Sequence, residues 1–99
     1  RLAQAEVPAW DDVEASFAEL IARVERAIAF VEDLDPTVFE GAEAREVTLT
    51  RRGETHVVNA IAYLQGQAIP NFYFHLATAY AILRHNGVEI GKRDFLGAA

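Results

Sequence analysis

The chain has 99 residues, of which 52% are hydrophobic and 24% are charged, a composition that fits one globular domain and excludes a disordered or collagen-like chain. Its formal net charge of -6 at pH 7 argues against nucleic acid as a partner, because an acidic surface repels phosphate. The absence of cysteine excludes disulfides and cysteine metal sites, and the cytoplasm is the expected compartment.

No apolar run approaches the ~20 residues that a bilayer-spanning helix needs, so no membrane partner is predicted. The sequence opens at Arg1 and contains no methionine. We therefore expect residues 1–99 to form a single domain that is the C-terminal part of a longer bundle protein.

The first ten residues lack periodicity and predict an extended arm. Asp11 followed by Glu14 then resembles a capping box, and apolar residues recur every three or four positions after it. This pattern predicts a helix of about 22 residues, on whose solvated face Glu19 and Arg23 have the spacing of an ion pair. The predicted apolar stripe consists of Val13, Phe17, Leu20, Ile21, Val24, Ile28 and Val31.

The next segment has period-two patterning around a glycine turn and predicts a β-hairpin. Asp35-Pro36 ends the first helix, and a short turn and a loop lead into the hairpin, whose own loop is Arg52-Gly53. Its expected cross-strand pairs are Arg51 with Glu54, Leu49 with His56, and Val47 with Val58. The last two pairs are predicted to face the core.

A final helical stretch follows, with Asn59 as its predicted N-cap. Pro70 leaves two alternatives open: two helices that meet near Ile69, or one helix of about 27 residues with a kink at the proline. Asn86-Gly87 provides a C-terminal stop. The tail beyond it has three predicted apolar anchors, Ile90, Phe95 and Leu96.

The helix from Asn71 to His85 is apolar on nearly all sides, so it is predicted to be central in its bundle. His75 shares a face with Asn71 and Thr78, and the favoured interpretation is a buried histidine that is hydrogen-bonded within this cluster or to the backbone. The alternative is a metal ligand or general base. A helical metal site wants a second ligand four residues away, but those positions hold Asn71 and Ala79.

Other chemistry finds little support in the sequence. Ser16 is the one serine and has no base nearby, and the glycines are too scattered for a phosphate loop. Tyrosines favour core packing but could also line a pocket. The candidate ligand-binding residues are His75, Asn71 and Tyr80, and no catalytic residue, metal site or cofactor is predicted.

The run from Pro70 to His75, continued by Leu83-Arg84-His85-Asn86-Gly87 and by Gly91 to Phe95, resembles the domain-of-unknown-function family 1993. Residues 10–34 and the hairpin also look like that family. The family is similar to DinB and YfiT-like bundles, so the resemblance implies a mainly α fold, an up-down-down-up four-helix bundle. This chain would cover the later helices, with the β-hairpin as a small insertion.

DinB-like proteins characteristically hold a divalent metal with three histidines, two of them four residues apart on the last helix. On that pattern His75 matches the second helical histidine, and Arg84 and Gly87 match the arginine and glycine that follow. Asn71 stands where the first histidine belongs. One of three ligands is kept, so the resemblance implies the fold but not the metal site.

Two functions compete at this point. The leading hypothesis is an uncharacterised, non-catalytic bundle that self-associates as a dimer or binds a small molecule near His75. The alternative is a divalent-metal-dependent enzyme of the DinB-like class, of the thiol-dependent transferase type, with His75 as a ligand. The sequence does not decide whether the chain is an enzyme.

Overall fold

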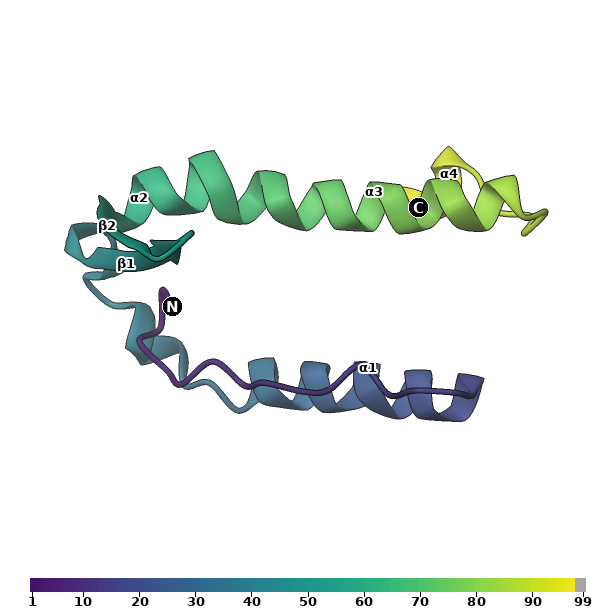
Figure 1. The fold of residues 1–99 in the computed structure, drawn as a ribbon, viewed down its shortest axis with the longest axis horizontal. Coiled ribbons are helices and arrows are strands. Elements are labelled where there is room, and N and C mark those ends of the chain that lie inside the picture. The colour runs from purple at the N-terminus through teal and green to yellow at the C-terminus, as the bar shows by residue number, and fades with distance from the viewer. Residues whose placement is uncertain (98–99) are drawn as a thin grey trace. The chain divides into compact units, whose positions relative to one another are not determined.

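The computed structural model describes residues 1–97, which divide into two compact units, Arg1–Ala60 and the residues from Ile61 onward. The fold is mainly helical, and the described residues contain one two-stranded antiparallel sheet (Figure 1). Within these residues, no helix combines the length and the apolar character needed to cross a membrane.

The first unit starts with an extended segment, residues 1–15, here called the arm, and continues into α1 (Phe17–Glu32). The predicted helix start at Asp11 is wrong, because Ser16 is the N-cap: its Oγ accepts a hydrogen bond from the amide of Glu19 at 3.2 Å. The Glu19 carboxylate accepts in turn from the amide of Ala15 at 2.8 Å. These two bonds satisfy amides that the helix itself leaves without a partner.

The same cap explains why the predicted pair between Glu19 and Arg23 does not form in the described residues. Glu19 is held at the helix start, where its carboxylate also accepts from the Ser16 hydroxyl at 3.0 Å. Arg23 instead pairs with two acidic residues of the arm, Asp12 and Glu14. The arm also contains Val13, which was predicted as the first residue of the helical stripe.

Two short 3-10 turns, η1 (Pro36–Phe39) and η2 (Ala42–Ala44), connect α1 to a hairpin of β1 (Glu46–Arg51) and β2 (Glu54–Asn59). The three predicted cross-strand pairs are all confirmed. Positive φ angles at both turn residues, 51° and 83°, match the turn type that follows the natural twist of paired strands.

Burial on the hairpin confirms only part of the predicted core face. Val47 and Leu49 on β1 are buried, and Val58 is half-buried. His56 is exposed, which contradicts the prediction. It lies near the turn, with its Nε2 atom 3.7 Å from the Glu54 carboxylate.

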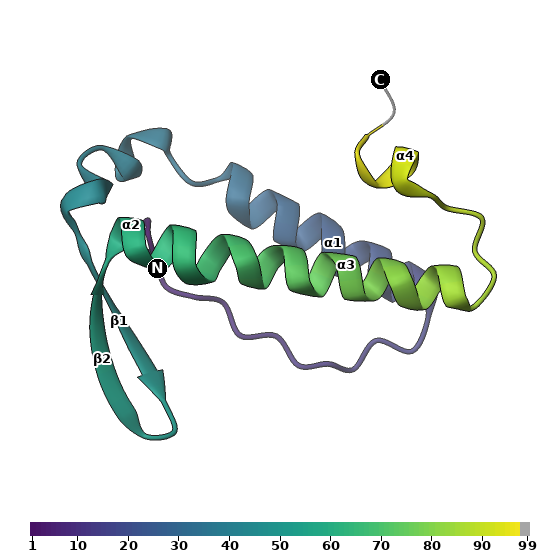
Figure 2. The same cartoon turned by 90° about the horizontal axis from the view of Figure 1, so that it is seen from above.

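The second long helical stretch resolves the alternatives at Pro70 in favour of one helix (Figure 2). It runs through α2 (Ala60–Tyr63), a π turn, η3 (Leu64–Ala68), and α3 (Ile69–His85). Proline lacks an amide hydrogen and collides with the carbonyl four residues before it. The wider turn just before the proline, in which the Ile69 amide bonds to the Leu64 carbonyl, avoids this collision.

The predicted stop at Asn86-Gly87 is confirmed as a Schellman motif. Gly87 has a φ of 89°, its amide donates to the Arg84 carbonyl, and the Val88 amide donates to the Leu83 carbonyl, both at 3.1 Å. The tail then forms one short turn, α4 (Lys92–Phe95). The last two residues of the predicted tail, 98 and 99, lie outside the described part.

Burial in this structure is slight and lies at the hairpin. Among residues 1–97, the buried apolar side chains are Val47, Leu49 and Ala60. Neither α1 nor α3 buries a single residue. Both long helices therefore leave large apolar side chains exposed.

Candidate functional site

The predicted site residues on α3 fall on two different faces of the helix. Asn71 and His75 are one turn apart and share a face, whereas Tyr80 lies about 140° around the helix from His75 at 3.6 residues per turn. The structure therefore keeps the polar pair together and places Tyr80 elsewhere.

His75 is exposed in the structure, so the predicted buried histidine is not found. Its nearest ring partner is Phe74, with ring centroids 5.3 Å apart in an edge-on arrangement. No hydrogen bond joins His75 to Asn71 or Thr78 in the described residues. The expectation depended on neighbouring helices that the unit does not contain.

The donor set around His75 does not fit a metal site in this chain. No three His, Asp or Glu side chains within residues 1–97 converge on a point that could hold a metal ion. The same-face neighbours one turn away are Asn71 and Ala79, an amide and a methyl group, which are poor substitutes for imidazole on zinc.

Tyr80 is half-buried and holds the C-terminal tail against α3. Its hydroxyl donates a hydrogen bond to the Gly91 carbonyl, and its ring meets the Phe95 ring edge-on with centroids 5.2 Å apart. Of the predicted tail anchors, Phe95 and Ile90 are half-buried, whereas Leu96 is 68% exposed. The hydroxyl of Tyr80 thus already has a structural role.

A hollow lies along one side of α3 and includes none of the three predicted site residues. Six residues of this one helix line it, and we call it the α3 hollow. They are Phe74, Ala77, Thr78, Ala81, Ile82 and His85. Two of them are alanines, and the other four are larger.

A second apolar surface lies on α1. Six large side chains recur along one face of the helix, and each is between 47% and 85% exposed. They are Phe17, Leu20, Ile21, Val24, Ile28 and Val31, and we call this face the α1 stripe. Apart from Val13, the stripe is the one predicted from the sequence.

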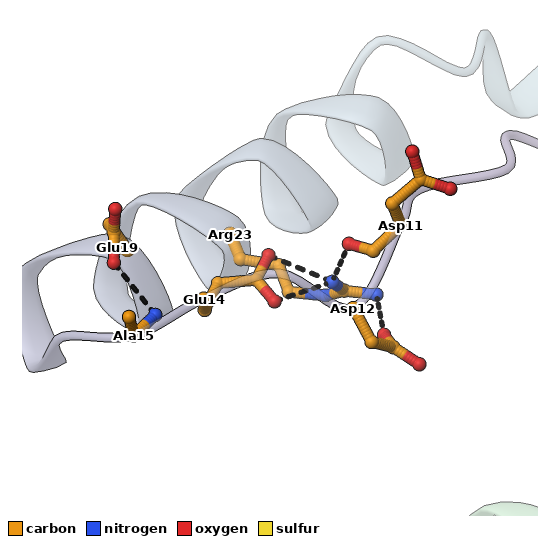
Figure 3. Close-up of polar contacts among 6 residues, drawn as sticks. All are labelled: Asp11, Asp12, Glu14, Ala15, Glu19 and Arg23. Carbon is orange, nitrogen blue, oxygen red and sulfur yellow. Dashed lines mark hydrogen bonds and ion pairs between the residues drawn. The ribbon is translucent and has the colours of Figure 1, made fainter.

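Arg23 of α1 attaches the arm to this helix (Figure 3). Its guanidinium lies 2.9 Å from the Asp12 carboxylate and 2.8 Å from the Glu14 carboxylate, and it also donates to the Asp11 carbonyl at 2.9 Å. Because the five donors of arginine are held in a rigid fork, these three contacts fix the position of the arm on α1.

Trp10 extends this attachment one helical turn further. The Arg26 guanidinium lies 4.1 Å above its ring, and that of Arg23 lies 6.0 Å away, which is the geometry of a cation–π contact. The earlier arm residues form a hollow together with Phe30 and Leu34. At 3.6 residues per turn, the side chains that the arm contacts lie roughly opposite the α1 stripe.

The pKa values in this cluster follow from the hydrogen bonds. The Arg23 guanidinium, by donating to Glu14, holds the pKa of that carboxyl below its usual value. The same contact raises the pKa of Arg23. Sequence reasoning missed this cluster, although an acidic run directly after Trp10 and two arginines on the next helix were visible signals.

The comparisons place the chain in a family. Residues 1–96 match the sequence profile of a domain of unknown function, DUF1993. The chain belongs to the DUF1993 family. No curated protein matches this DUF1993 chain.

A solved structure of a DinB family member from Shewanella denitrificans is similar to the DUF1993 chain. The two share 39% sequence identity with a TM-score of 0.81, and the match covers 93% of this chain and 51% of that one. The chain therefore spans about half the length of the structure that it matches. Together, the two matches make it a DinB-like DUF1993 protein, as the resemblance predicted.

Proposed function

We propose that this chain is a non-catalytic, DinB-like bundle module that works by self-association. The observation that carries the proposal is the α1 stripe, whose six large side chains are each at least 47% exposed. The arm occupies the opposite side of the helix, so the stripe is the side left for a partner. A contiguous apolar surface of this kind marks a surface that associates in water.

A four-helix bundle provides the architecture for this association. Such a bundle buries the apolar faces of four long helices around one core, and the described residues contain two long helical stretches, α1 and the rod from α2 to α3. A second copy would add two more. We therefore propose a symmetric homodimer in which residues 1–99 act as one domain, with the cytoplasm as its predicted location.

Light scattering coupled to size exclusion, over a wide concentration range, tests the proposal. We expect a dimer of twice the 10.9 kDa chain mass, with dissociation only on strong dilution. A monodisperse monomer at every concentration would contradict self-association. So would a polydisperse aggregate, because a symmetric dimer closes on itself.

A small-molecule site at Asn71, His75 and Tyr80 is the second candidate function. It is supported by the exposed imidazole and amide that share one face of an otherwise apolar helix. The Tyr80 ring lies on another face, and its hydroxyl is used by the tail. A ligand would therefore contact mainly Asn71 and His75.

Metal analysis separates these proposals from the metal-dependent enzyme. After removal of metal and incubation with zinc, nickel or manganese ions, we expect far less than one bound ion per chain, since His75 has no second ligand one turn away. Stoichiometric metal that His75→Ala abolishes, with unchanged helix content by circular dichroism, would favour the enzyme and contradict the non-catalytic proposal.

A further inference from the structure

The stop of α3 contains the one Asn-Gly pair of the sequence, Asn86-Gly87. We propose that Asn86 is a site of spontaneous deamidation, and that the folded stop holds this reaction back until the last turn of α3 opens. The proposal concerns a covalent modification of the chain and does not depend on self-association. The stability of the stop thus sets the rate at which the chain acquires an additional negative charge.

The reaction needs only the two neighbouring residues, a base and water. The Gly87 backbone nitrogen gives its proton to the base and attacks the side-chain carbonyl carbon of Asn86. A bond forms between this nitrogen and Cγ, the bond from Cγ to Nδ2 breaks, and Nδ2 takes up a proton and leaves as ammonia. Water then opens the cyclic imide at either carbonyl, which gives aspartate or isoaspartate.

The surroundings of Asn86 make it the most reactive asparagine of the chain. Gly87 has no side chain to shield its nitrogen, and a Cβ atom built on it would meet nothing within 4 Å. Both residues are exposed, so base and water reach them. The other two asparagines, Asn59 and Asn71, are each followed by a residue with a side chain, which hinders the same attack.

The folded stop gives both reacting groups other partners. The Gly87 amide donates to the Arg84 carbonyl at 3.1 Å, so the proton that base must remove is in a hydrogen bond. The Asn86 Nδ2 atom donates to the Ile82 carbonyl at 2.8 Å, and the backbone amide of Asn86 donates to the same oxygen at 3.1 Å. The side-chain amide is therefore held back toward the helix and away from the nitrogen that attacks it.

Opening of the last turn removes this protection. The stop is closed by a third bond, from the Val88 amide to the Leu83 carbonyl at 3.1 Å, across the left-handed Gly87. Helix ends open locally at a much lower free-energy cost than the whole chain unfolds. Because the three bonds belong to one motif, opening frees the Asn86 side chain and the Gly87 nitrogen together.

The product disfavours the closed stop. A carboxylate at position 86 lies at the C-terminus of α3, where the helix dipole is negative, and it can no longer donate to the Ile82 carbonyl. Isoaspartate also adds one carbon to the backbone before Gly87, which moves the following amides out of register. The tail that the Tyr80 hydroxyl holds at Gly91 comes directly after the stop. We therefore expect deamidation to loosen the tail.

Deamidation rates in the folded and the unfolded chain test the proposal. The full chain is incubated at mildly alkaline pH with and without denaturing urea, and peptide mass spectrometry measures the loss of each asparagine. We expect Asn86 to react at least about tenfold faster in urea, because opening of the stop is then no longer required. In urea, Asn59 and Asn71 should react more slowly than Asn86.

A matched pair of proline substitutions tests whether the stop provides the protection. Val88→Pro cannot donate to the Leu83 carbonyl, whereas Glu89→Pro removes the next amide, which is not part of the stop. Both variants keep the Asn86-Gly87 pair. We expect Val88→Pro to raise the rate in the folded chain at least about threefold, because it removes one bond of the motif, and Glu89→Pro to change it much less.

Each outcome supports or overturns the proposal. An Asn86 that stays intact in urea overturns the deamidation site, and equal rates with and without urea overturn the protection. Equal rates in the two proline variants, with helix content unchanged by circular dichroism, show that the stop does not control the reaction. If Val88→Pro unfolds the chain, the comparison of the unchanged chain with and without urea decides.

Discussion

At the residue scale, the contact between Arg23 and the arm makes a pH-dependent attachment. The pKa of Glu14 is lowered, first of all by the hydrogen bond from Arg23, so the attached state favours the ionised carboxylate. An acid with a lowered pKa stabilises attachment fully above its ordinary value and loses that contribution as the pH falls through the lowered value. The attachment of the arm should therefore weaken in acid.

Trp10, the one tryptophan of the chain, reports this event. Detachment removes the ring from the Arg26 guanidinium, now 4.1 Å away, and exposes it to water. We expect the emission of Trp10 to shift to longer wavelength as the pH falls below the usual range of glutamate. Arg23→Gln should produce the shifted emission already at neutral pH.

Two substitutions control this titration. Glu14→Gln cannot ionise, so it should remove most of the pH dependence between neutral pH and the acid range. Glu25→Gln removes a carboxylate of α1 outside the cluster and should leave the transition in place. If the emission spectrum of the unchanged chain does not vary with pH, Arg23 and Glu14 do not hold the arm.

The same residues show where sequence reasoning stops. Asp11 with Glu14 and Ser16 with Glu19 both have capping-box spacing, and the chain uses the second pair. Arg23 of α1 binds the Asp11 carbonyl and the Glu14 carboxylate, so the first pair does not cap the helix. The local sequence pattern does not reveal this contact. The exposure of His75 was not predicted for a related reason. Whether its side chain is buried depends on other helices that pack on α3, and the local sequence does not reveal them.

At the element scale, local chemistry was a better guide. The hairpin register followed from period-two patterning and a glycine turn, because a shift of one residue would turn every side chain to the other face. The helix stop at Gly87 followed from the need for a left-handed residue there. The π turn before Pro70 was not predicted, because a kink and a widened turn both accommodate the hydrogen bond that proline cannot donate.

At the scale of the whole molecule, net charge opposes the proposed dimer while apolar contact favours it. Each copy carries a charge of -6 at pH 7, so bringing two copies together costs repulsion that salt screens over about 10 Å at 0.1 M ionic strength. The six side chains of the α1 stripe are all apolar, so they form no ion pair across the contact.

Salt should therefore strengthen the dimer. We expect the dissociation constant, measured by sedimentation equilibrium, to fall as sodium chloride is raised from about 0.05 M to about 0.5 M, because screening removes repulsion and no attractive ion pair is lost. Sodium sulfate should act in the same direction and more strongly, since it also favours burial of apolar surface. A dimer that salt weakens would instead be held by ion pairs, and an apolar contact through the α1 stripe would be wrong.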